Sequence, residues 1–359
     1  MQRRLLVPVL AWLALLAGPA GAGQLASPLD PARWPAGAAA GSPPPCPEAP
    51  APVRDLAAVM YYADAAGSAV DQDRRDENRA IVKPLDEFTR LLLVQSNRFM
   101  RTGDARRAAC GFGMLHGWAE AGALTGELSL QGQFHRNWAT NAFATAYLIL
   151  SGAVDAEPAR DQAVQDWLAE LCRLDQQLAE RVSNNHLAWS AASCASVAVA
   201  TDQRALLDWS VGVAEQVLDE VDALGVLPRE IGRGERALAY HNFALEALTV
   251  VAEMAWPNGA DLYAYRDGAL PRLADFVIRN AEDPAEAGEL AGTPQSWSGA
   301  TSGRFVWAEP YQRRFDDPRL ALLLGRLRPM RHAYFGGDAT LMYADATLLP
   351  RAPAGDHPE

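Results

Sequence analysis

Apolar residues recur at intervals of three and four along most of the chain, which is the period of an amphipathic helix. Pro158 stands where the first turn of a helix tolerates a proline, just ahead of the clearest stripe. That stripe consists of Val164, Trp167, Leu168, Leu171, Leu174, Leu178 and Val182. The pattern predicts a helix that carries this stripe on its buried face.

Two further stripes predict helices later in the chain. One follows Thr201, a candidate N-cap, and contains Leu206, Leu207, Val213, Val217, Leu218 and Val221. The other stops before residues 256–259 and contains Leu238, Leu245, Leu248 and Val251. A short strand is expected only near residues 305–307. The Gly-, Ser- and Pro-rich residues 280–310 are expected to form a long loop.

Many helices of similar length, joined by short polar turns, favour stacked helical hairpins. Because the chain has 359 residues and lacks a heptad repeat, we expect an all-α fold. The predicted form is a single-domain (α/α) toroid, or barrel, of helical hairpins over residues 53–350. Such a toroid leaves a groove at one end, which suits a linear polymer.

The two ends of the chain differ from this body. Arg3 and Arg4 precede an apolar run over residues 5–16, and small residues at 20–22 offer a cleavage site. Since the run is too short to span a bilayer, residues 1–22 are interpreted as a signal peptide and the protein as periplasmic. Residues 23–52 are predicted to form a Pro- and Ala-rich arm, and residues 351–359 a disordered tail.

The net charge and the cysteine content limit the classes of partner that this chain could bind. The net charge of −12 and the lack of a basic tract argue against nucleic acid, although a local arginine cluster could still attract a polyanion. Four cysteines in an exported protein allow three full pairings, and Cys194 in an Ala-rich run could be a buried thiol. No spacing suggests a metal site, so we expect no metal, no cofactor, no membrane partner and a monomer.

Two motifs concentrate polar residues within apolar helices. The first is Asn184-Asn185-His186-Leu187-Ala188-Trp189, where the structural alternative is a helix N-cap followed by a satisfied histidine. The second runs from Arg233 to Phe243 and contains Tyr240-His241-Asn242. Arg233 and Tyr240 are seven residues apart, so they would share one face of a helix. The structural alternative is a core tyrosine with a bonded hydroxyl.

Together the motifs contain the groups that β-elimination from a uronic acid needs. The proton on C5 is weakly acidic, so an amide, histidine or arginine must neutralise the adjacent carboxylate. A tyrosine near a cation can remove that proton and protonate the leaving oxygen on C4. In β-mannuronate both lie on the same side of the ring, so one tyrosine can serve both steps.

The paired motifs resemble the signature of family 5 of the polysaccharide lyases, the mannuronate-specific alginate lyases, over residues 61–338. The resemblance implies an (α/α) toroid that cuts poly-β-D-mannuronate (alginate). It makes Tyr240 the base and acid, and places Asn185, His186 and Arg233 around the substrate carboxylate. It also implies substrate binding by Gln131, Arg136, Trp138, Trp189 and His241, a lid carrying Tyr61 or Tyr62, and a disulfide between Cys46 and Cys110.

The chain departs from this family at three positions, Asn137, Ala188 and Tyr334, which we interpret as subsite positions. A broader polyuronate lyase, acting on polyglucuronate or hyaluronan, is therefore an alternative. Two other classes remain open. A hydrolase needs two carboxylates flanking the bond, and Asp86, Glu87 and Glu309 lie outside both motifs. A non-catalytic polysaccharide-binding protein of an export assembly would not need the hydroxyl of Tyr240.

Overall fold

The computed structural model describes residues 24–35 and 45–344. The predicted signal peptide and the predicted tail lie outside the described residues. The longer helices, in chain order, are α1 (Gln72–Thr102), α2 (Ala105–Glu120), α3 (Leu130–Leu150), α4 (Pro158–Ala179), α5 (Asn185–Ala200), α6 (Arg204–Leu218), α8 (Ala237–Ala255) and α9 (Tyr265–Arg279). Shorter ones are α7 (Pro228–Ile231), α10 (Ala285–Ala291), α11 (Ala308–Phe315), α12 (Pro318–Leu327) and α13 (Ala339–Tyr343). No described helix has the length and apolar character needed to cross a membrane.

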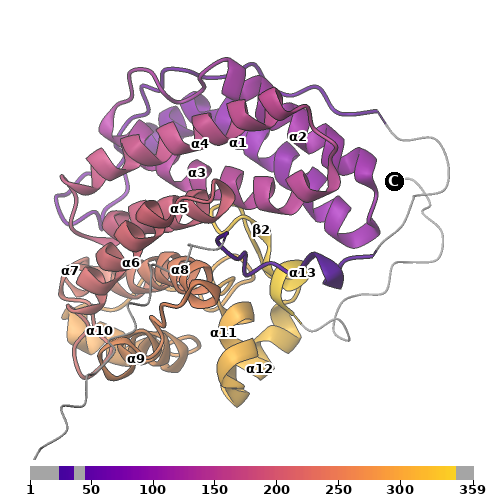
Figure 1. Ribbon diagram of the computed structural model, residues 1–359. Helices are drawn as coiled ribbons and strands as arrows, with labels where there is room; N and C mark the ends of the chain where they lie inside the picture. The colour runs from indigo at the N-terminus through magenta and orange to yellow at the C-terminus, as the bar shows by residue number, and fades with distance from the viewer. Residues whose placement is uncertain (1–23, 36–44, 345–359) are drawn as a thin grey trace, which may run out of the picture.

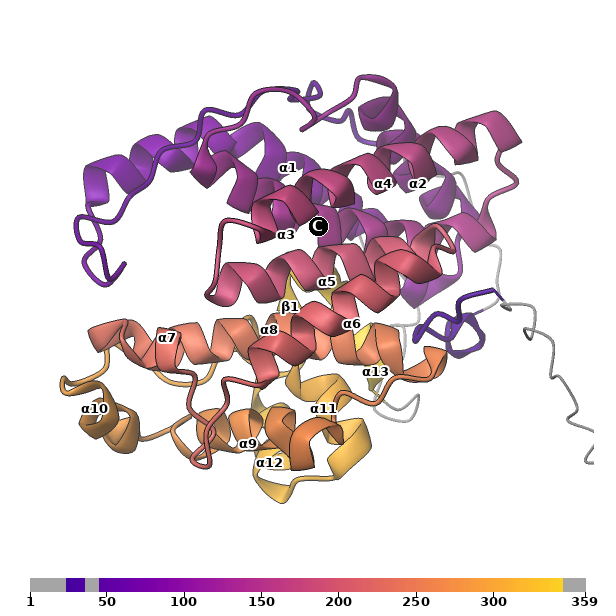
Figure 2. The same cartoon turned by 60° about the vertical axis from the view of Figure 1, so that its left-hand side comes forward.

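The helices stack in chain order across the molecule, which confirms the predicted all-α toroid of hairpins. Figure 1 shows α1 to α4 on one side, α9 to α12 on the other, and α5 and α8 between them. Figure 2, seen from a second direction, shows the same order. α5 packs against α3, α4, α6 and α8. Its Ala- and Ser-rich sequence presents small side chains on every face, so four neighbours can approach it.

The only sheet within the described residues is small, yet it contributes to the site. β1 (Arg331–His332) pairs antiparallel with β2 (Gly337–Asp338), and Arg331 lies opposite Asp338. The turn between them carries Tyr334 toward the centre of the molecule, where its ring stacks on Trp138 of α3 with centroids 4.7 Å apart. A segment far along the sequence thereby meets the N-terminal helices.

Several boundaries differ from those expected. α4 ends at Ala179, so Val182 follows the helix. Thr201 does not cap α6, which begins at Arg204; it ends α5, and its hydroxyl donates to the Val197 carbonyl. The strand expected at residues 305–307 is wrong, because these residues form a turn that leads into α11. The expected loop over 280–310 is interrupted by α10.

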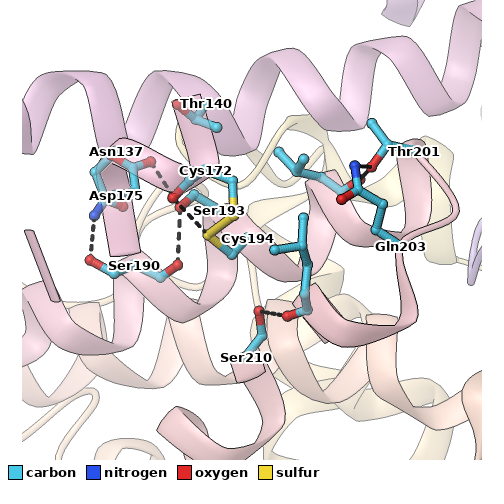
Figure 3. Close-up of a disulfide and its surroundings, with 12 residues drawn as sticks. Asn137, Thr140, Cys172, Asp175, Ser190, Ser193, Cys194, Thr201, Gln203 and Ser210 are labelled. Atoms are coloured by element: carbon cyan, nitrogen blue, oxygen red, sulfur yellow. Dashed lines mark hydrogen bonds between the residues drawn. A yellow bond between two sulfur atoms is a disulfide. The ribbon is translucent and has the colours of Figure 1, made fainter. Parts of the chain in front are cut away.

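Two disulfides are present within the described residues. Cys46 of the N-terminal arm is bonded to Cys110 of α2, as expected. Cys194 is not a free thiol: it is bonded to Cys172, which links α5 to α4 (Figure 3). The arm also packs onto the body through three side chains that are less than a tenth exposed, Leu25, Leu29 and Trp34.

Candidate functional site

A cavity of about 660 Å³ lies between α3, the start of α5, the start of α8 and a hairpin formed by residues 61–71. We call this segment the lid hairpin. Its strands are joined by hydrogen bonds from Asp71 N–H to the Tyr61 carbonyl and from Ala63 N–H to the Ala69 carbonyl, both 2.9 Å long. The predicted residues that line the cavity are Tyr61, Tyr62, Gln131, Trp138, His186, Arg233 and Tyr240.

The tip of the lid hairpin is rigidified by an acidic side chain. Asp64 accepts hydrogen bonds from the Ser68 hydroxyl, 2.6 Å away, and from the backbone N–H groups of Ser68 and Ala69. The Ser68 hydrogen bond, with the backbone N–H groups, holds the pKa of the Asp64 carboxyl below its usual range. The carboxylate therefore closes the turn from within.

Tyr62 of the lid meets the predicted base directly. The Tyr240 hydroxyl donates to the Tyr62 hydroxyl over 2.6 Å, and Arg236 Nη1 donates to the same Tyr62 oxygen over 2.9 Å. Tyr240 is only 8% exposed. Burial, and then Tyr62, raise the pKa of Tyr240 above its ordinary value, while Arg236 and Arg233 act in the opposite direction. At neutral pH Tyr240 is therefore a protonated phenol.

Arg233 reaches Tyr240 by a route that the helical spacing did not predict. α8 begins at Ala237, and Arg233 lies before the 3-10 turn Gly234–Arg236, so the two residues do not share a helix face. The guanidinium nevertheless lies over the Tyr240 ring, 4.3 Å from its centroid. It donates to the Ala66 carbonyl of the lid hairpin over 2.6 Å and pairs with Glu230 at 3.5 Å.

His186 stands at the first turn of α5. Asn184 caps that helix by accepting the His186 backbone N–H over 3.1 Å, as the N-cap interpretation anticipates. The imidazole stacks on Phe134 with centroids 3.5 Å apart. Burial, with the nearby charge of Arg233, lowers the pKa of His186 to about 3. At neutral pH the ring is uncharged and can donate one hydrogen bond into the cavity.

Asn185 lies behind the cavity wall and does not line it. The residue is 1% exposed, its backbone N–H donates to Glu230 over 2.6 Å, and its amide nitrogen lies 3.3 Å from both Glu230 oxygens. Glu230 also holds Arg233. Asn185 is thus connected to the cavity through a shared carboxylate, and direct contact with substrate is not supported.

Polar residues of α3 form part of the cavity wall. Both the Gln131 amide nitrogen, at 3.3 Å, and the Asn78 amide nitrogen, at 3.2 Å, lie at His135 Nε2, which therefore accepts from them. Burial lowers the pKa of His135 to about 4, so this ring is also uncharged. Trp138 is 6% exposed and stacked on Tyr334, which does not support the predicted stacking of a sugar on its ring. Its Nε1 has no hydrogen-bond partner among the described residues.

Three predicted binding residues point away from the cavity. Arg136 is buried and donates from Nε to Asp175 over 2.9 Å; Figure 3 shows Asp175 beside the Cys172–Cys194 disulfide. Trp189 is fully buried and packs on Phe243. The structure does not support direct contact of these two residues with substrate, because each side chain is enclosed by the protein.

His241 is the third of these residues, and both of its ring nitrogens are used inside the fold. Its Nδ1–H donates to the Ala237 carbonyl over 2.8 Å, and Nε2 accepts from the Leu227 N–H over 2.9 Å. The side chain is 0% exposed. Burial lowers its pKa to about 4, so it is uncharged at neutral pH. His241 fixes the approach to α8 and has no nitrogen left for a sugar.

Of the three positions interpreted as subsites, only Tyr334 lines the cavity. Ala188 is fully buried, and Asn137 is 1% exposed with its amide 2.7 Å from the Ser190 hydroxyl (Figure 3). Substitutions at these two positions change packing around α5. Any altered contact with substrate therefore falls to Tyr334.

Several residues that line the cavity were not predicted from the sequence. Arg236 lies inside the second motif but was not chosen, and Arg304 stands in a Gly- and Ser-rich loop without a motif. His332 and Glu246 line the opposite wall as an ion pair. Burial alone would lower the pKa of His332, but Glu246 raises it above its ordinary value.

Comparisons with known proteins show the family to which the chain belongs. The alginate lyase family matches residues 55–287. A polysaccharide lyase of Stenotrophomonas maltophilia is 33% identical over 83% of this chain and 90% of that protein. An alginate lyase of Azotobacter vinelandii is also 33% identical, over 88% of each chain. Among solved structures, a variant of alginate lyase A1-III complexed with a tetrasaccharide superposes with a TM-score of 0.74 at 25% identity, covering 83% of this chain and 86% of that one. The chain therefore belongs to the alginate lyase family.

Proposed function

We propose that this polysaccharide lyase cuts poly-β-D-mannuronate by β-elimination at a uronic acid and releases oligosaccharides with a C4–C5 double bond. The observation that supports this most is the convergence of Tyr240, His186 and Arg233, from separate segments, on one cavity. Each supplies a different group that the elimination requires. The lid hairpin of the same chain forms part of the wall of this cavity.

The first requirement is to neutralise the uronate carboxylate, so that charge can develop on it as the C5 proton leaves. Arg233 brings a permanent positive charge, and the uncharged His186 brings a hydrogen-bond donor. Asn185 acts as a positioning residue through Glu230, which it shares with Arg233. The carboxylate would thus lie between one cation and one neutral donor.

The second requirement is proton transfer. Tyr240, as a phenolate, takes the C5 proton; the C–H electron pair forms the C4–C5 double bond, and the bond from C4 to its oxygen breaks. The leaving oxygen then takes the proton from Tyr240, which regenerates the phenolate. Because the C5 proton and the C4 oxygen of β-mannuronate lie on the same side, one hydroxyl can reach both.

The compartment and assembly are part of the proposal. We place the enzyme in the periplasm as a monomer, on the basis of the signal-like residues 1–22 and the disulfides Cys46–Cys110 and Cys172–Cys194. An oxidising compartment allows such bonds to persist. Secretion of the intact chain, with loss of about the first 22 residues on mass spectrometry, is the expected result.

Ultraviolet absorbance of the unsaturated product tests the activity. Purified protein is incubated separately with poly-mannuronate, poly-guluronate, poly-glucuronate and hyaluronan, and a rise with poly-mannuronate alone is expected. A rise with poly-glucuronate or hyaluronan as well would favour the alternative of a broader polyuronate lyase. No rise with any polymer would contradict the proposal and favour a non-catalytic binding protein.

A Tyr240→Phe variant separates catalysis from binding. It keeps the ring and removes the hydroxyl, so turnover should fall at least 1,000-fold, on the order expected when an enzyme loses its acid–base group, while polymer binding persists. Calorimetry with poly-mannuronate measures the binding. Full activity in this variant would exclude the mechanism.

A further inference from the structure

A second cavity of about 490 Å³ adjoins the main one and is bordered by three arginines. Arg75 comes from α1, Arg236 from the turn before α8, and Arg304 from the loop before α11. The two cavities share Tyr61, Arg236 and Arg304 in their walls. The two cavities are therefore neighbours, and we call the second one the arginine cavity.

None of the three arginines forms an ion pair with any residue in the described ranges 24–35 and 45–344. Arg236 donates to the Tyr62 hydroxyl, and Arg304 donates to the Ser298 hydroxyl over 2.8 Å and to the Gly299 carbonyl over 2.9 Å. Glu235 also borders the arginine cavity but pairs with none of them. Elsewhere in this acidic chain arginines such as Arg279 and Arg319 each contact two carboxylates.

The charges in the arginine cavity repel one another. Burial, and then the neighbouring charge of Arg236, lower the pKa of Arg304 below its ordinary value. The charges of Arg236 and Arg75 both oppose the rise that burial causes in the pKa of Tyr61, a residue that lines both cavities. Cations gathered in this way without an anion are best satisfied by a ligand that brings one, and a carboxylate matches the fork of a guanidinium.

We propose that Arg75, Arg236 and Arg304 form a subsite for the carboxylate of a uronate residue outside the pair of sugars whose bond is cleaved. This inference deepens the proposed function and rests on it, since a linear polyuronate carries one carboxylate on every sugar. Lid residues Tyr61 and Ser68 form part of the same wall. An occupied subsite therefore connects α1 and the loop before α11 to the closed lid hairpin.

The test uses Arg75→Gln and Arg304→Gln, with Arg74→Gln as the matched control. Arg74 precedes Arg75 on α1, but it is exposed, lies beside Asp71 and borders neither cavity. Steady-state kinetics are measured on mannuronate oligomers of increasing length. Loss of a charge-assisted hydrogen bond should raise KM about tenfold on long oligomers and less on the shortest oligomer that is cleaved. The change should fall on KM rather than on kcat.

A second readout is salt dependence. Removing one arginine should make the fall of affinity with added salt shallower, because one fewer charge contact is screened. Calorimetry of the same substitutions in a Tyr240→Phe background measures this without turnover, and thermal melts check that each variant is folded. If Arg75→Gln and Arg304→Gln match Arg74→Gln at every length and salt concentration, the subsite is excluded.

Failure of the subsite and failure of the proposed function give different results. Absence of unsaturated product from the unsubstituted protein with every polyuronate would remove the function, and the subsite with it. Normal cleavage with unaltered KM in both arginine variants would remove the subsite alone.

Discussion

The hydroxyl oxygens of Tyr62 and Tyr240 lie 2.6 Å apart, although 178 residues separate them in the chain. Arg236 donates to Tyr62 from the other side, so a cation, a lid hydroxyl and the proposed base form one hydrogen-bonded chain. The sequence left open which of the two lid tyrosines closes over the substrate; both line the cavity, and Tyr62 is the one that forms a hydrogen bond with Tyr240. The lid therefore participates in setting the protonation of Tyr240.

Tyr62→Phe should lower kcat by about 10- to 100-fold, because it removes the hydroxyl that orients the Tyr240 hydroxyl by a hydrogen bond, while it retains the ring. KM should change less than kcat. Tyr61→Phe removes a neighbouring hydroxyl that does not contact Tyr240, so its effect on kcat should be smaller. Equal losses of kcat in the two variants would show that the hydrogen bond to Tyr240 is not what matters.

Gly67→Ala should reduce kcat/KM about tenfold, since a left-handed alanine is strained by about 1–2 kcal/mol. Gly67 has φ +67°, and an added Cβ would lie only 2.5 Å from Arg233 Nη1. The lid tip or the guanidinium must therefore move. Gly113→Ala in α2 is the control, because a Cβ there meets nothing within 4 Å. Loss of activity in both variants would indicate a general effect of the substitution.

The rate should rise with pH through the neutral and alkaline range. Burial raises the pKa of Tyr240, so its ionisation lies in the alkaline range. The phenolate that acts as the base therefore becomes more populated as pH increases. His186, with a pKa of about 3, stays uncharged over that whole range and should add no second transition. A kcat profile from pH 5 to 10 measures this. An optimum below pH 6 would contradict the assignment of Tyr240 as the base.

His241→Leu should lower the free energy of unfolding by about 2 kcal/mol at pH 7, since it leaves the buried Leu227 N–H without an acceptor. The folded-state pKa of about 4 is below the ordinary value, so the stabilisation by His241 is complete above pH 6.5 and is lost as pH falls toward 4. The difference between the two proteins should shrink to near zero by about pH 5, at roughly 1.4 kcal/mol per pH unit. Urea titrations at both pH values measure it, and a constant difference would refute this account.

A chelator should leave turnover unchanged. Within residues 24–35 and 45–344, no group of three or more His, Cys, Asp or Glu side chains is arranged to hold a metal ion. The proposed elimination uses the Arg233 guanidinium to neutralise the substrate carboxylate, a role that a metal ion could fill in another enzyme. Inhibition by a chelator that is reversed by one particular metal would reveal a site missed by this mechanism.

The helices could be predicted because their apolar stripes reflect burial directly. Val164, Trp167 and Leu168 were expected on one face, and all are buried in α4. Boundaries were harder, since Thr201 is equally suited to capping a helix or to ending one. It does the latter through the Val197 carbonyl.

The site was predictable where a motif brought its own residues together and not where the partner lay elsewhere. A polar residue in an apolar helix must meet either a ligand or another polar group, and the sequence does not distinguish the two. Arg136 meets Asp175, 39 residues away, and His241 meets Leu227. Arg304 shows the opposite: it lines the cavity, although it lies in a loop that contains no recognisable motif.

The hydrogen bond from Arg233 to the Ala66 carbonyl has a consequence for how a long polymer enters. The lid hairpin holds both the Arg233 guanidinium and the Tyr240 hydroxyl, which are the groups that a sugar acid would contact. A polymer must therefore compete with the enzyme's own backbone, and short fragments with few carboxylates compete poorly. We expect competition of this kind to favour long chains and to hasten the departure of small products.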